Sequence, residues 1–337
     1  MIIHFLQSLY NQTKLPKKES DYQILIEDIH HFSIEPQVYH LLKQHDRLNE
    51  TPAFFTDYLK KATDQILLQN LFIKVQMEKI LKLFETQKID TIPLKGVYFA
   101  EKYFGHIAAR STSDIDLLIH QKDRQTVDGI LRNRGFIYED EGPKDHFHCI
   151  YRLDFPGSSI PLRVEIHWNL LKENTSDLDI IEFWNDAVPI MAYQHIKELS
   201  HQQAFYMIVL HAWRHNLDSL RHFIDVIQTV YVLANKICFE SLFIQAKKDK
   251  TLKRVQRTLR IVYRVFGEIK YPEQLSVPKN YGKWWEYKKI RDREYRSLRV
   301  YLDFFDFEYL SYENGKHRFR TVKEFYTKRI HSLSPSE

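Results

Sequence analysis

Residues 110–119 read RSTSDIDLLI, in which two aspartates open a short apolar run. The alternation of Asp114, Ile115 and Asp116 predicts a strand, and the apolar run after it is typical of an inner strand. Residues two apart on a strand point to the same face, so the carboxylates of Asp114 and Asp116 converge. Two such charges repel each other unless a cation neutralises them. Because hard oxygen ligands without thiols favour magnesium or manganese, the pair predicts a site for Mg²⁺ (or Mn²⁺).

Upstream of this strand, the chain carries a possible phosphate-binding turn. Residues 88–94 form a β-prone run, which is followed by Lys95, Gly96 and a helical stretch over residues 97–103. A glycine at such a turn lets the backbone approach a phosphate, and the helix N-terminus presents free N–H groups to an anion. The Lys95 ammonium either neutralises phosphate charge or is a solvated group at a strand end, and the sequence leaves both interpretations open.

Downstream, Glu165 lies in a predicted strand over residues 160–168. Its neighbours Val164 and Ile166 face the opposite side, so Glu165 shares the face of the aspartates if the two strands are adjacent. Any one of these features alone is weak. Their order is more specific: a strand, a glycine turn and a helix, then the aspartate pair on a strand, then an acidic residue on a later strand.

Outside this stretch the sequence is helical. Residues 1–85 and 173–337 show the helical period, whereas residues 86–172 alternate between strands and helices. Within the middle segment we expect a helix over residues 122–134 and strands over residues 136–139 and 147–154. The sequence therefore predicts an α+β fold, in which a small mixed sheet is flanked by an N-terminal helical segment and a C-terminal helical domain.

This order of motifs resembles the DNA polymerase beta-like nucleotidyltransferase superfamily. More narrowly, it resembles a bacterial family of uncharacterised nucleotidyltransferases. The resemblance covers roughly residues 64–235, and the segments that carry it are LKGVYFAEKYF (94–104), RSTSDIDLLI (110–119), RNRGF (132–136), VEIHW (164–168) and LHAWRH…RHFIDV (210–226).

The resemblance implies a metal-dependent enzyme that moves a nucleoside monophosphate from a nucleoside triphosphate, such as ATP, to an acceptor. Asp114, Asp116 and Glu165 would be the metal ligands and catalytic residues, and Gly96 would lie against the triphosphate. The superfamily usually has Gly-Ser or Gly-Gly where this chain has Gly96 and Val97. That departure keeps a second hypothesis open. The chain would then be a nucleotide-binding regulatory or partner protein that retains the nucleotidyltransferase palm, residues 86–172, but does not catalyse the transfer.

Further residues near these motifs are candidates for the same cleft. Arg110, four residues before Asp114, either partners the two acids or binds phosphate. The resemblance places His167, His211, His215 and Asp225 in a substrate cleft that faces the palm. For the two histidines of the predicted helix, simple packing inside a buried helix is the favoured alternative.

Two zinc interpretations are weak. His211 and His215 have the spacing of a zinc-protease helix, but Ala212 stands where that chemistry needs a glutamate. His146 and His148 would share one strand face while Cys149 points the other way, so these residues indicate a histidine-bearing sheet surface.

The charge distribution does not favour nucleic acid as a partner. The formal net charge is +5, from 49 basic and 44 acidic residues. A basic helical stripe, Lys253, Arg257, Arg260 and Arg264, is best interpreted as a solvated face, and acidic residues interrupt the aromatic and basic residues between Lys283 and Arg299. The expected acceptor is therefore a small molecule or a peptide.

Cysteine content and hydropathy predict a cytoplasmic protein. The two cysteines, Cys149 and Cys238, are too few and too far apart for a disulfide scaffold. The most apolar stretch, Phe205 to Trp213, is less than half of the ~20 residues needed to cross a bilayer. We therefore expect no membrane partner.

Overall fold

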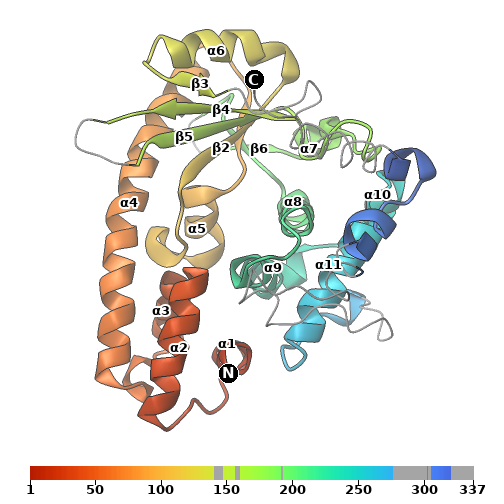
Figure 1. The fold of residues 1–337 in the computed structure, drawn as a ribbon. Coiled ribbons are helices and arrows are strands. Elements are labelled where there is room, and N and C mark those ends of the chain that lie inside the picture. Colours follow the sequence, from red (N-terminus) through yellow and green to blue (C-terminus); the bar gives the residue numbers. More distant parts are fainter. Residues whose placement is uncertain (140–146, 156–159, 191–192, 276–301, 303–304, 320–337) are drawn as a thin grey trace, which may run out of the picture.

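The computed structural model describes residues 1–139, 147–155, 160–190, 193–275, 302 and 305–319. The fold is α+β, as the sequence predicts: helices surround one five-stranded mixed sheet (Figure 1). Among the described residues no single helix is long and apolar enough to span a membrane. One helix pair passes that test by length and composition, Leu220–Lys236 with Phe239–Lys248, and it is bent by 116°.

The N-terminal segment is helical, as predicted. Its helices are α1 (Ile2–Tyr10), α2 (Glu19–Phe32), α3 (Glu35–Gln44) and α4 (Ala53–Thr86), with a 3₁₀ turn at Leu48–Glu50. Helix α4 is 34 residues long because no glycine or proline interrupts it after Pro52, its N-cap. Its second half buries Ile73, Met77, Ile80 and Phe84 on one face, which is the face that the sequence period predicts.

The sheet has the strand order β1-β2-β5-β4-β3. Its strands are β1 (Thr91–Pro93), β2 (Asp114–Ile119), β3 (Ile137–Glu139), β4 (His148–Leu153) and β5 (Leu162–His167). Strands β2 and β5 are parallel and the other neighbours are antiparallel. Strand β1 is shorter than the predicted run because Lys88 adopts a left-handed conformation in the turn that leaves α4.

The two faces of the sheet differ in chemistry. One face packs Ile115, Leu117 and Val164 against α4 and against Val127 of α6 (Arg124–Arg132). The opposite face carries the polar residues of β2 and β5, because side chains alternate along each strand. A dry core on one face thus holds the acidic residues in place on the other.

The C-terminal segment is mostly helical, as predicted. Its elements are α7 (Ile180–Asn185), α8 (His201–Arg214), α9 (Leu220–Leu233), α10 (Phe239–Lys248), α11 (Leu252–Val265), 3₁₀ turns at Ala234–Lys236 and Glu273–Leu275, a π-helical turn at Asp306–Leu310, and a two-stranded pair, β6 (Val188–Pro189) and β7 (Lys197–Glu198). Both α9 and α11 bury an apolar stripe, which includes Phe223 and Ile227 in α9 and Val255 and Leu259 in α11.

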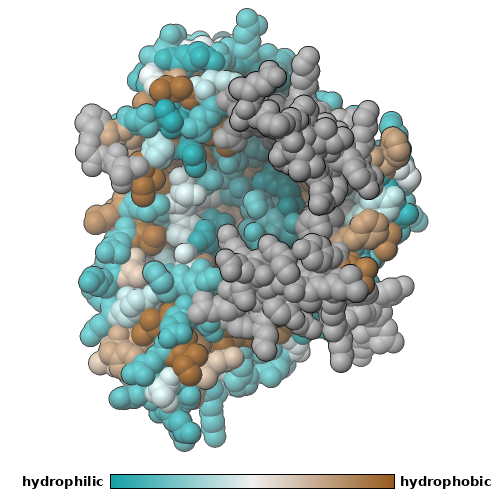
Figure 2. All heavy atoms as spheres, viewed as in Figure 1, coloured by the Kyte–Doolittle hydropathy of each residue, from teal (hydrophilic) through white to brown (hydrophobic). Residues whose placement is uncertain are grey.

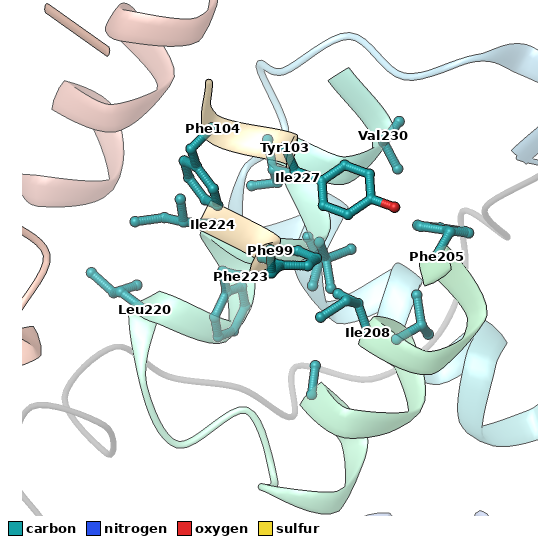
Figure 3. Close-up of a cluster of buried hydrophobic side chains, with 14 of the residues drawn as sticks. Phe99, Tyr103, Phe104, Phe205, Ile208, Leu220, Phe223, Ile224, Ile227 and Val230 are labelled. Carbon is teal, nitrogen blue, oxygen red and sulfur yellow. The ribbon is translucent and has the colours of Figure 1, made fainter. Parts of the chain in front are cut away.

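Helix α5 (Gly96–Phe104) joins the sheet to the C-terminal helices. In Figure 3, its residues Phe99, Tyr103 and Phe104 lie among apolar side chains of α8 and α9, including Phe205 and Phe223. The same core cluster also includes residues of α1 to α3. The first turn of α5 therefore lies between the sheet and the C-terminal helices, with its position fixed by a shared core.

The basic stripe on α11 is only partly the solvated face that the sequence predicts. Lys253 and Arg264 are exposed, but Arg257 and Arg260 are half-buried. Arg257 forms an ion pair with Asp306, because the π-helical turn packs against this side of the helix. The segment from Lys283 to Arg299 lies outside the described residues.

Candidate active site

Asp116 and Glu165 stand opposite each other on neighbouring parallel strands. The register of β2 and β5 pairs Asp116 with Glu165 and Asp114 with Arg163. Residues paired in this way point to the same face of the sheet, so Asp114, Asp116 and Glu165 share a face, as the sequence predicts. The side chain of Asp116 is 1% exposed and that of Glu165 is 18% exposed.

The turn between β1 and α5 covers this acidic face. The backbone N–H of Leu94 donates to the Asp116 carbonyl oxygen at 3.0 Å. The Lys95 ammonium then lies 2.9 Å from Asp116 Oδ1, with only 11% of its side chain exposed. The interpretation of Lys95 as a solvated lysine is therefore wrong, because the ion pair with Asp116 holds it inside the site.

Gly96 brings the first turn of α5 against the aspartate strand. Its φ is +70°, and an added Cβ would meet Thr112 Cγ2 at 3.2 Å and the Asp114 carbonyl oxygen at 3.3 Å. Both the backbone conformation and the lack of space require glycine here. The side chain of its N-cap residue, Lys95, does not cap the α5 N-terminus, so within the described structure its N–H groups are available to an anion beside Asp114.

His167 lies in the acidic cluster beside Asp116 and Glu165, where the sequence pattern predicts Asp114 as the third member. Its Nε2 lies 3.2 Å from Asp116 Oδ1 and 3.2 Å from Glu165 Oε2. Among the described residues, Asp116, Glu165 and His167 form the group whose possible ligand atoms lie within 4.8 Å of one another. Asp114 is not in that group, although it lies on the same face. The structure thus moves His167 from the predicted substrate cleft to the candidate metal cluster.

The local charges act differently on the two aspartates. Burial and the neighbouring Asp116 carboxylate raise the pKa of Asp114 to about 6. Burial would also raise the pKa of Asp116, but the Lys95 ammonium and the His167 hydrogen bond outweigh it and hold that pKa well below its usual range. Asp116 is therefore the permanent anion of the pair, and Asp114 gains its charge near neutral pH.

Arg110 is committed to Asp225. Its Nε and Nη2 donate to the two carboxylate oxygens at 2.9 Å each, and both side chains are buried. This pair connects the segment before β2 to helix α9. Asn70 of α4 secures the same segment by donating to the carbonyl oxygens of Ile107 and Arg110. Arg110 and Asp225 thus hold the palm against the helical domain, and Asp225 does not stand open to a cleft.

The chain is similar to one family of known proteins over most of its length. The model of the family described as "Uncharacterised nucleotidyltransferase" matches residues 18–267. The protein belongs to this nucleotidyltransferase family. The solved structure of the antibiotic-resistance factor ANT(2'')-Ia also matches, with 14% sequence identity and a TM-score of 0.31 over 58% of this chain and 95% of that chain. No curated protein matches.

In this nucleotidyltransferase, the end of α8 faces the acidic residues of the sheet. Burial, and then the Lys95 ammonium, lower the pKa of His211 well below its usual range. Burial and Arg214 lower the pKa of His215 to about 3, and the ring of His215 stacks on His222 at 5.1 Å. Figure 2 shows a hollow with hydrophilic (teal) residues between the sheet and the C-terminal helices.

The structure describes His148 and Cys149 of the predicted histidine-bearing strand. His148 lies on the same face as His167, and their rings stack at 5.0 Å. Cys149 is buried on the opposite face, in the core beneath the sheet. His146 lies outside the described residues. This arrangement agrees with a histidine-bearing sheet surface.

Sequence reasoning missed the contribution of Asn70 and the bridging position of His167. Asn70 gave no signal, because one amide on a long helix looks like an ordinary surface residue. His167 did carry one: it follows Glu165 by two residues on a strand, so it must share the face of Glu165.

Proposed function

We propose that the protein moves a nucleoside monophosphate from a nucleoside triphosphate to a hydroxyl or phosphate of an acceptor, with a divalent metal ion at Asp114, Asp116 and Glu165. The observation that carries this proposal is the pairing of Asp116 with Glu165 across two parallel strands, beside the uncapped N-terminus of α5. This arrangement supports the proposal because carboxylates bind divalent ions and uncapped helix N-termini favour phosphate.

The residues present fit a divalent ion. Lys95 and His167 both approach Asp116 Oδ1, whereas Asp116 Oδ2 is buried and has no hydrogen-bond partner in the described structure. A buried carboxylate oxygen without a partner is costly, and a cation would satisfy it. Asp116, Glu165 and Asp114 would hold Mg²⁺ or Mn²⁺, the hard ions that carboxylate oxygens favour.

The protein's own groups have separable tasks in such a reaction. An acceptor oxygen would attack the α-phosphorus, the bond from that phosphorus to the α,β-bridging oxygen would break, and pyrophosphate would leave. A bound divalent ion would supply the charge that aligns the acceptor oxygen and stabilises the leaving group. Glu165, the more exposed of the two paired acids, would receive the acceptor's proton, and the α5 N-terminus with Lys95 would bind the triphosphate.

The acceptor is proposed to be a small molecule or a peptide. The α11 stripe offers only Lys253 and Arg264 as exposed charges, while Arg257 is engaged with Asp306. That leaves this helix a weak phosphate-binding surface for RNA.

The test is incubation with each nucleoside triphosphate labelled at the α-phosphate, with Mg²⁺, Mn²⁺ or EDTA, and with size-fractionated cell extract as the source of acceptor. The proposal expects metal-dependent release of pyrophosphate and label in a fraction of small molecules or peptides. Label in RNA would contradict the acceptor class. Absence of transfer with every nucleotide and metal would contradict the activity.

One observation favours a second function, a nucleotide-binding regulatory or partner protein without turnover. The Lys95 ammonium already neutralises Asp116 without a metal ion. In that case the protein would bind a nucleoside triphosphate equally well in Mg²⁺ and in EDTA, and pyrophosphate would not be released.

A further inference from the structure

Arg214 is the last residue of α8, and the Glu165 and Asp116 carboxylates act on its charge. Its guanidinium carbon is 5.1 Å from the centroid of the Phe147 ring. Phe147 in turn lies 6.1 Å from the ring of His167, which contacts both Asp116 and Glu165. Glu165 and then Asp116 are the acids that favour the charged form of Arg214. The guanidinium is thus close to the candidate metal cluster.

Arg214 lacks the short polar contacts that three other buried arginines make, and in this it resembles Arg221, whose Nη2 donates to the Ser33 carbonyl oxygen at 3.4 Å. Arg110 pairs with Asp225, Arg47 pairs with Glu50, and Arg254 donates to the Thr175 carbonyl. Arg214 forms no ion pair with any residue that the structure describes, and its hydrogen bond is a long one of 3.4 Å to His215 Nε2. Burial lowers its pKa, because a guanidinium removed from water without a counter-charge is in an unfavourable state.

The two neighbouring histidines of α8, His211 and His215, do not supply that counter-charge. His211 and His215 have lowered pKa values and are neutral at physiological pH. Neutral imidazoles offer hydrogen bonds but no charge, so at this end of α8 the positive charge is that of Arg214. The guanidinium fork matches a phosphate, which it binds with two parallel hydrogen bonds.

We propose that Arg214 binds a phosphate of the nucleoside triphosphate from the side of the helical domain, opposite the turn of Lys95 and Gly96. This inference rests on the proposed function. It assigns substrate binding to α8, so that the triphosphate is held from both sides of the hollow. Phosphate binding would give Arg214 the ion-pair partner that none of the described residues provides.

The experiment measures binding of two probes to the full chain by calorimetry in Mn²⁺: inorganic tripolyphosphate and each nucleoside triphosphate. Variants are Arg214→Gln, Arg214→Lys and the control Arg132→Gln, whose arginine is 52% exposed and pairs with Asp128 on α6. We expect Arg214→Gln to weaken both probes by about 10- to 100-fold, the worth of charge-assisted hydrogen bonds. Arg214→Lys should have an intermediate affinity for both probes, because it keeps the positive charge but cannot form two parallel hydrogen bonds. Arg132→Gln should bind both probes with the affinity of the wild type.

Thermal unfolding of each variant shows that it is folded, and removal of a buried unpaired charge should not destabilise Arg214→Gln. Binding of both probes by Arg214→Gln within twofold of the wild type would overturn the inference and leave the proposed function standing. Weaker nucleotide binding with unchanged tripolyphosphate binding would also overturn it, because Arg214 would then contact the nucleoside. A wild-type protein that binds neither probe in Mn²⁺ would contradict the proposed function itself.

Discussion

The Lys95 ammonium lies 2.9 Å from Asp116 Oδ1, and the pair is almost fully buried. Lys95 comes from the turn after β1, and Asp116 comes from the middle of β2. The ion pair therefore fixes the turn between β1 and α5 to the strand that carries the carboxylates. For the metal-free protein we therefore expect opposite effects on stability when Asp114 or Asp116 is replaced, because their pKa values shift in opposite directions.

Asp116→Asn should destabilise the metal-free protein, because Lys95 then keeps a buried charge without its partner. Loss of one member of a buried pair costs on the order of 3 kcal/mol. Urea unfolding in EDTA measures the change, and the matched control is Asp114→Asn, two residues earlier on the same face. Equal stability of Asp116→Asn and the wild type would show that the ion pair contributes nothing.

Asp114→Asn should stabilise the metal-free protein at neutral and alkaline pH, but not at acidic pH. The pKa of Asp114 rises from an ordinary 3.8 to about 6 on folding, so the unfolded chain loses this proton first. Stability from this residue then falls as pH rises from about 4 to 6, and the full penalty is present at pH 8. Unfolding midpoints in EDTA should coincide for the two proteins at pH 4 and favour Asp114→Asn at pH 8. A constant difference at both pH values would contradict the assignment.

Gly96→Ala should weaken nucleoside triphosphate binding as well as stability. The added Cβ would press on Thr112 and the Asp114 carbonyl, in a backbone conformation that alanine disfavours. Gly105→Ala is the matched control, because Gly105 has φ +77° and an added Cβ there would meet no atom within 4 Å. Both substitutions should cost about 1 kcal/mol or more in stability. Calorimetry should show weaker nucleotide binding for Gly96→Ala alone, and equal losses in both variants would place the effect in backbone strain.

The Arg110–Asp225 pair should prove structural. Asp225→Asn removes the negative charge that neutralises the buried Arg110, and it should lower the free energy of unfolding by about 3 to 5 kcal/mol. The double substitution Arg110→Met with Asp225→Leu should lower it much less. The double variant should bind nucleoside triphosphate within about threefold of the wild type. A tenfold or larger loss in the double variant, with the fold intact, would return Arg110 to the role of a phosphate ligand that the sequence suggests.

Much of this arrangement could be predicted from the sequence, because it depends on strand periodicity. The alternation in DIDLLI and in LRVEIH determines which side chains share a face, and β2 and β5 lie together as that reasoning requires. The partners of Lys95 and Arg110 could not be predicted in this way. Asp225 is 115 residues from Arg110, and a one-dimensional pattern does not show which helix end meets which strand. The same holds for Arg214, whose place is set by the packing of α8 against α5.

The proposed function requires that the acidic face of β2 and β5 holds a divalent ion together with a nucleoside triphosphate. Electron paramagnetic resonance of Mn²⁺ measures this directly, in the presence of triphosphates whose α,β-bridging oxygen is replaced by methylene so that pyrophosphate cannot leave. The wild type and Arg132→Gln should bind Mn²⁺ with the same affinity. Glu165→Gln, which keeps size and removes one ligand charge, should bind it at least about tenfold more weakly. Equal Mn²⁺ affinity in Glu165→Gln and the wild type would contradict the account.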